Sequence, residues 1–189
     1  MLQEYATIDL VDYFDYIIGE AMMDVDSPGY GGARFPVEAR IDSRRFVTFH
    51  IDVAVGDVFI EPLENMKCRD WLAFAGIARP TVRAISAEQQ FAEKLHAYTL
   101  PRQNPNSRVR DLLDMLLLTE SGRLSRTLTA QAIRTTFKTR KTHEVPNEFA
   151  EPPASWSKPF AALALECGAP VDIGHATAVV RSLFESLAM

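Results

Sequence analysis

Three aspartates and one lysine have the side-chain types and the spacing that a catalytic or phosphate-binding site needs. Lys94 lies in the segment AEKLHAYTL, Asp111 and Asp114 lie in RDLLDMLLL, and Asp52 lies in the alternating segment RFVTFHIDVAV. Carboxylates hold Mg²⁺ and lysine binds phosphates, so this set fits metal-dependent phosphoryl or nucleotidyl transfer. The spacing alone supports this chemistry only weakly, because acids and lysines also populate ordinary solvated surfaces.

The lysine and two of the aspartates are predicted to meet on a helical hairpin. A capping box in SAEQQ begins a first helix, whose apolar stripe consists of Phe91, Leu95 and Tyr98. The polar stretch PRQNPNS ends it, and a second helix follows whose apolar face consists of Val109, Leu112, Leu113, Leu116 and Leu117. A short loop between such helices makes an antiparallel pair. We therefore expect the carboxylate of Asp111 or Asp114 to lie within salt-bridge reach of the Lys94 amine.

Asp52 is predicted to project from the solvent side of a β-hairpin. Apolar residues alternate in ARFPVEARI and again in RFVTFHIDVAV, and Asp42 and Ser43 supply turn residues between them. This pattern predicts two strands with one clearly buried face. Because side chains alternate along a strand, Asp52 points away from the core side chains. We expect it to face a common cleft with Lys94.

The remaining elements predict an α+β fold in which strands precede helices. Residues 8–18 are interpreted as a short helix running into a strand, and the proline-rich residues 143–159 as a linker or surface loop. Three further helical segments are predicted, at 128–140, 157–166 and 171–187. The order suggests a β-rich region over residues 1–85 and a helical domain over residues 86–189.

The charge of the chain is unevenly distributed. The net charge is −5, yet residues 100–141 hold nine Lys or Arg against three acids, a local balance of +6. A basic segment in an acidic protein attracts phosphates locally, although ordinary solvated helix faces explain it as well. Within this segment Arg102, Arg108 and Arg110 are candidates for contacts with nucleotide or RNA phosphates, and a solvated loop is an equal alternative.

Several common classes of site are excluded because their sequence motifs are absent. The sequence has no GxxxxGK[ST], no GxSxG and no HExxH, which removes the usual phosphate-loop, hydrolase and zinc-protease interpretations. Its first residues lack the basic and apolar regions of a secretory signal, and no apolar run is long enough to cross a membrane. We expect a cytoplasmic protein with no membrane partner.

Two segments resemble a known family. GGARFPVEARIDSRRFVTFHIDVAVGD and AEKLHAYTLPRQNPNSRVRDLLDMLLL are similar to the AbiEii/AbiGii (MenT-like) toxins, nucleotidyltransferases related in fold to DNA polymerase β-type enzymes. The likeness is sharpest in EKLHA followed by RxRDLxD. It implies that Asp52 is the strand carboxylate beside the metal site, Lys94 the triphosphate-binding lysine, and Asp111 or Asp114 the acid of the helical motif.

The resemblance also implies Mg²⁺, an NTP substrate, transfer of NMP often to a tRNA 3′ end, and an antitoxin partner. The family's Gly-Ser turn and Asp-x-Asp strand, which supply its two main metal ligands, have no counterpart at the corresponding place in this sequence. Asp24 and Asp26 form an Asp-x-Asp in the connection before the hairpin, and we interpret them as loop acids. With one strand carboxylate, the chain by itself is expected to have absent or very low activity.

Three functional interpretations follow from these observations. The first is a nucleotidyltransferase toxin of a toxin–antitoxin pair that lacks its first catalytic motif. The second is a non-catalytic remnant that keeps the fold to bind a nucleotide, RNA or an antitoxin. The third is a helical protein-interaction domain without a ligand.

Overall fold

The computed structural model describes residues 2–9, 13–22, 32–54, 59–70, 73–76, 78–102 and 108–187. The chain divides into two compact units, Met1–Asp57 and Val58–Met189. Antiparallel sheets of three and two strands combine with helices, which confirms the predicted α+β class. The division into compact units falls after Asp57, and the domain boundary placed between residues 85 and 86 stays a prediction.

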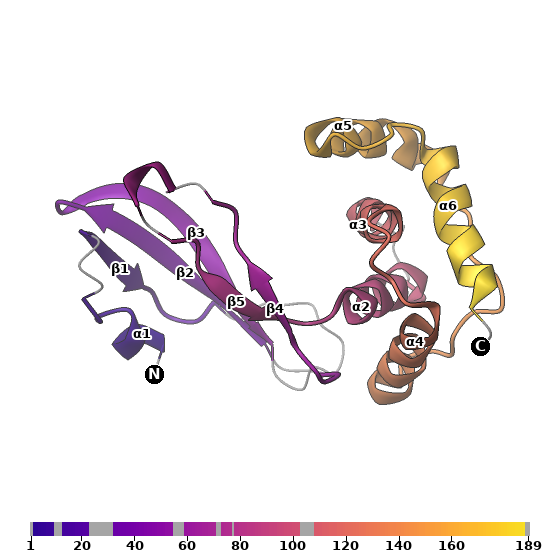
Figure 1. The fold of residues 1–189 in the computed structure, drawn as a ribbon, viewed down its shortest axis with the longest axis horizontal. Coiled ribbons are helices and arrows are strands. Elements are labelled where there is room, and N and C mark those ends of the chain that lie inside the picture. The colour runs from indigo at the N-terminus through magenta and orange to yellow at the C-terminus, as the bar shows by residue number, and fades with distance from the viewer. Residues whose placement is uncertain are drawn as a thin grey trace. The chain divides into compact units, whose positions relative to one another are not determined.

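The first unit is built around a three-stranded antiparallel sheet in which β2 lies between β1 and β3 (Figure 1). Its elements are α1 (Leu2–Tyr5), β1 (Phe14–Ile18), β2 (Gly32–Ile41) and β3 (Arg44–Ala54). The hairpin predicted from alternation is therefore confirmed. Asp42 and Ser43 form its two-residue turn with φ angles of 48° and 61°, the left-handed pair that a type I′ turn requires.

The predicted buried face of this hairpin is correct for the middle of β2, wrong for Ile41 at its end, which is 39% exposed, and wrong for β3. Val37 and Ala39 on β2 are each 2% exposed, whereas Val47 and Phe49 on β3 are 45% and 41% exposed. Alternation fixes the face on which a side chain lies, and it does not say whether another layer covers that face. Upstream, β1 confirms the strand expected in residues 8–18, and Ile8, Asp9 and Tyr13 of the expected helix are not helical, while residues 10–12 lie outside the described residues.

The second unit contains a small β-hairpin and the main helices. Its strands are β4 (Glu64–Lys67) and β5 (Thr81–Ala84), and its 3₁₀ turns are η1 (Ala73–Ala75) and η2 (Ala154–Trp156). Its helices are α2 (Ala87–Thr99), α3 (Val109–Glu120), α4 (Arg126–Arg140), α5 (Ser157–Cys167) and α6 (Ile173–Ser186). Every helix predicted after residue 85 is thus present. The Ser86 hydroxyl accepts a hydrogen bond from the Gln89 amide at 3.2 Å, which confirms the cap that starts α2.

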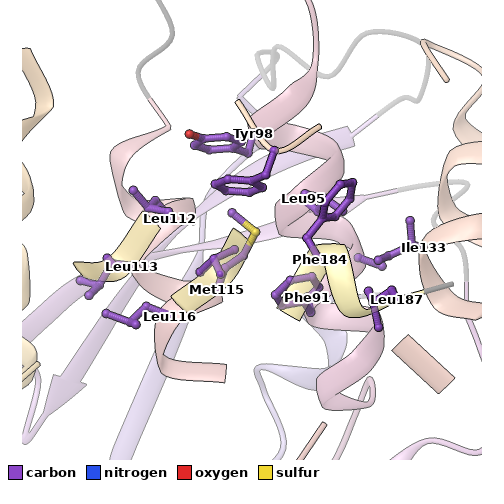
Figure 2. Packing of buried hydrophobic residues seen from close by; sticks show 14 of the residues in the cluster. Phe91, Leu95, Tyr98, Leu112, Leu113, Met115, Leu116, Ile133, Phe184 and Leu187 are labelled. Atoms are coloured by element: carbon purple, nitrogen blue, oxygen red, sulfur yellow. The ribbon is translucent and has the colours of Figure 1, made fainter. Parts of the chain in front are cut away.

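Helix α2 lies between α3 and α4, and α6 packs against α3 (Figure 1). The apolar stripes of these helices form one core. Figure 2 shows its central side chains, which include Phe91, Leu95, Leu112, Met115 and Leu116, all 0% exposed. The predicted face of α3 needs one correction: Leu117 is 37% exposed and Met115 takes its place in the core.

The proline-rich segment before α5 is packed rather than extended into solvent. Phe149 is 4% exposed, and its ring stacks on Tyr98 of α2 with the ring centroids 5.0 Å apart. The Tyr98 hydroxyl donates to the Ala150 carbonyl at 2.8 Å, and Trp156 meets the Tyr98 ring edge-on at 5.9 Å. These contacts tie the segment to the helix that carries Lys94.

Candidate functional site

Lys94, Asp111 and Asp114 form a compact ion cluster between α2 and α3. The Lys94 Nζ atom lies 3.1 Å from Asp111 Oδ1 and 2.7 Å from Asp114 Oδ2. Lys94 sits beside the buried residue Leu95, so the core packing of α2 fixes where its side chain starts. The two aspartates are three residues apart and therefore share one side of α3. The predicted contact is confirmed for both acids.

Two opposing effects, burial and the neighbouring carboxylates, act on the pKa of Lys94. Burial lowers the pKa of Lys94, but hydrogen bonds and attraction from Asp114 and Asp111 outweigh it, so the pKa of Lys94 is raised above its usual 10.5. The Asp111 side chain is only 8% exposed, while those of Lys94 and Asp114 are 37% and 34% exposed. The lysine is thus held as a cation with one side open to solvent.

One oxygen of Asp111 is left without a close donor. Among the described residues Asp111 Oδ2 has no hydrogen-bond partner, and its nearest cation is Arg108, whose Nη1 lies 3.8 Å away. A buried carboxylate oxygen without a donor is costly, so it usually marks a place where a further donor binds. The cluster therefore retains acceptor capacity at Asp111 and, with two of three N–H groups used, donor capacity at Lys94.

The predicted phosphate-binding arginines occupy different positions. Arg108 is the N-cap residue of α3 and joins the cluster through Asp111. Arg110 is exposed in the first turn of α3, and Arg102 is exposed just after α2. The roles of all three in binding phosphate stay predictions.

Asp52 pairs with a neighbouring strand instead of standing alone. It lies directly opposite Arg34, and the two side chains form a bidentate pair in which Nε to Oδ1 and Nη2 to Oδ2 are both 2.7 Å. The hydrogen bonds from Arg34 lower the pKa of Asp52 despite some desolvation. Both carboxylate oxygens are therefore engaged by a fixed cation.

This pairing competes with a Mg²⁺ site at Asp52. A metal needs carboxylate oxygens free of competing cations, and no group of three or more His, Cys, Asp or Glu gathers anywhere in the described part of the chain. The Asp-x-Asp of Asp24 and Asp26 lies outside the described residues. The metal role of Asp52 and its sharing of a cleft with Lys94, which belongs to the other unit, stay predictions.

A comparison with protein families decides the class of the protein. The family model described as nucleotidyl transferase AbiEii toxin of a type IV toxin–antitoxin system matches residues 2–171. The chain belongs to the AbiEii family. The match spans both units and includes the three aspartates and the lysine predicted to be catalytic, Asp52, Lys94, Asp111 and Asp114. No curated protein matches the sequence.

Membership of the AbiEii family supports a nucleotidyltransferase toxin-like role and implies a nucleotide substrate and an antitoxin partner. The family generally uses a divalent metal with its NTP. In the segments that the structure describes, every helix is too short or too polar to cross a bilayer.

The sequence interpretation missed the residues that hold α2 in place on its other side. Glu93, next to Lys94, accepts from Arg140 of α4 at 2.7 and 2.9 Å. The nearly buried Glu88 accepts from the Ser125 amide at 3.0 Å and so caps the start of α4. The signal was available: an acid on a helix face that also carries core residues needs a partner.

Proposed function

We propose that this AbiEii-family chain binds a nucleoside triphosphate through Lys94 and belongs to a machinery that transfers NMP to an RNA acceptor, such as the 3′ end of a tRNA. The observation that carries the proposal is the cluster in which Asp111 and Asp114 hold the Lys94 ammonium at 3.1 and 2.7 Å. A lysine fixed in this way needs little reorganisation to meet a phosphate.

The parts of the cluster suit different tasks. The third N–H of Lys94 remains to donate to a phosphate oxygen, since the other two donate to Asp111 and Asp114. Asp111 anchors the lysine from the buried side, because its side chain is 8% exposed. Asp114, which is 34% exposed, is the partner that a triphosphate displaces or approaches most closely. Arg108 adds positive charge next to Asp111.

Replacing Lys94 tests the proposal. Lys94→Ala is expected to weaken NTP binding about tenfold, because it removes a charge-assisted hydrogen bond to phosphate. Isothermal titration calorimetry with ATP, GTP, CTP and UTP measures the effect. Lys158→Ala is the matched control, since this exposed lysine on α5 carries the same charge outside the cluster and should leave binding unchanged. Equal affinities for Lys94→Ala and the unmodified chain would contradict the proposal.

A second variant tests whether a loss of NTP binding in Lys94→Ala comes only from misfolding. Asp114→Asn leaves Asp111 to hold the lysine and removes one negative charge from the cluster. If Lys94 meets phosphate, NTP affinity should stay the same or rise. A loss of affinity as large as that of Lys94→Ala would mean that the cluster only stabilises the helix pair.

The second candidate function is a non-catalytic module that binds a nucleotide, RNA or an antitoxin. The bidentate Arg34–Asp52 pair favours it, because Asp52 is the strand carboxylate expected beside a metal. Incorporation of labelled nucleotide into total tRNA by the purified chain separates the two. Binding without incorporation supports the module, and incorporation that Lys94→Ala abolishes supports the transferase.

A further inference from the structure

A cavity of about 550 Å³ opens at the C-terminal end of α4, away from the Lys94 cluster. Among the described residues its lining holds three cations, Arg134, Lys138 and Lys141, and one acid, Glu144. Arg134 and Lys138 are four residues apart and share one face of α4, and Lys141 follows the helix as its C-cap residue. The cavity is thus a basic hollow of the size that holds a ligand group.

The wall of this cavity is fixed by a network of hydroxyls and imidazoles. His143 contacts the Thr142 hydroxyl through Nδ1 at 3.0 Å and the Thr99 hydroxyl through Nε2 at 2.8 Å. The Thr142 hydroxyl also lies 2.7 Å from Nε2 of His96. These bonds connect the segment after α4 to α2, and they hold the wall in one arrangement before any ligand arrives.

The network itself carries no charge near neutral pH. Burial lowers the pKa of His143, although Glu144 opposes the effect, and burial together with His143 and Arg140 lowers the pKa of His96 to about 4. With both rings neutral, each hydroxyl can accept one hydrogen bond and donate another. The positive potential of the cavity therefore comes from Arg134, Lys138 and Lys141.

The helix dipole accounts for only part of this pattern. Cations in the last turn of a helix are favourable, which explains Lys138 and Arg140. Arg140, however, is bound to Glu93, and Arg134 stands more than a turn earlier. All fifteen residues of α4 include four basic side chains and no acid, in a chain whose net charge is −5.

A row of cations suits an extended polyanion better than a compact one. Arg134 and Lys138 are about 6 Å apart along the axis of α4, and Lys141 extends the row beyond the end of the helix, so the row covers more than one phosphate of a nucleic-acid strand. Contacts of this kind position a nucleic acid without reading its sequence.

We propose that the cavity at the end of α4, with Lys138 and Lys141 as its main cations, binds backbone phosphates of the RNA acceptor. The proposal rests on the proposed function in that it takes RNA as the acceptor. It places RNA contact on the α4 side of α2, whereas NTP contact is on the α3 side.

The test is the salt dependence of RNA binding. Fluorescence anisotropy with 3′-labelled tRNA, at salt concentrations between about 50 and 200 mM, gives the affinity and the slope of log K against log salt. The double variant Lys138→Gln/Lys141→Gln should bind about tenfold more weakly at low salt and show a slope smaller by about 2. Lys158→Gln, which removes an exposed charge on α5, should change neither quantity.

The outcomes separate this inference from the proposed function. An unchanged slope in Lys138→Gln/Lys141→Gln, or the same loss in Lys158→Gln, would overturn the α4 site even if NTP binding remains. Loss of RNA binding in the double variant, with calorimetric NTP binding intact, supports the site. If the unmodified chain binds no NTP but its RNA affinity still depends on these lysines, the α4 site stands and the NTP proposal fails. Polyglutamate that competes as effectively as unlabelled tRNA would replace RNA with an acidic polypeptide and overturn the inference.

Discussion

Leu116→Ala is expected to lower the free energy of unfolding of the second unit by about 2 to 5 kcal/mol. Leu116 is 0% exposed and lies in the core that α3 shares with α2 and α6, so its removal leaves a cavity that the neighbouring side chains fill only partly. Urea denaturation measures the loss. The fluorescence of Trp156, 5% exposed in the same core, is a suitable probe in a Trp71→Phe background where it is the only indole.

The next residue supplies a matched control. Leu117→Ala removes the same atoms from the same helix, but Leu117 is 37% exposed, so the loss should stay below about 1 kcal/mol. Leu113→Ala, at 2% exposure, should behave like Leu116→Ala. Equal losses at Leu116 and Leu117, or a loss at Leu116 well under that of the control, would show that the assigned face of α3 is wrong.

The helices of the second unit were predictable because their signals are local and periodic. The Ser86 cap and the stripe of Phe91, Leu95 and Tyr98 fixed the start and the buried face of α2. The same periodicity predicted the buried face of α3 with one residue wrongly assigned, because Met115 rather than Leu117 enters the core. Antiparallel pairing across a short connection was then enough to bring Lys94 to both aspartates.

The packed proline-rich segment was not predictable in the same way. Phe149 is buried by contacts with Tyr98 and Phe184, which are far from it in the sequence. The prolines and polar residues around Phe149 give no helical or alternating period. The sequence therefore predicts a loop and does not show that Phe149 is buried. Only the presence of aromatic residues in such a loop hinted that part of it is buried.

A β-bulge in the hairpin is the reason why the partner of Asp52 was not predicted from the sequence. Alternation put Asp52 on the face of β3 opposite to Phe49, and a regular hairpin closed by Asp42 and Ser43 would set Ala33 opposite Asp52. The register shifts between Ala39 and Arg40, and this bulge brings Arg34 opposite Asp52 instead. A single extra residue thus decides whether the carboxylate is free for a metal or bound to a guanidinium.

Acidification is expected to destabilise the second unit through His96. Burial, followed by electrostatic repulsion from His143 and Arg140, lowers the pKa of His96 from 6.5 to about 4. Between these two values the unfolded chain binds a proton that the native protein excludes, so the free energy of unfolding falls as pH falls from about 6.5 to about 4. The full separation corresponds to a loss of about 3 kcal/mol. Because His96 is 6% exposed, solvent screening reduces this value little.

The contribution of His96 can be isolated by a variant that cannot titrate. His96→Gln keeps a polar side chain within reach of the Thr142 hydroxyl, which lies 2.7 Å from Nε2 in the native protein. Urea denaturation at pH 7, 6, 5 and 4 should give a flatter stability profile for His96→Gln than for the unmodified chain, with the two profiles converging toward pH 4. Carboxylates titrate in both proteins, so the difference between the profiles reports His96 together with its coupling to His143. Parallel profiles across this range would show that His96 takes up its proton in the native state, and the neutral network of His96, Thr142 and His143 would then be wrong.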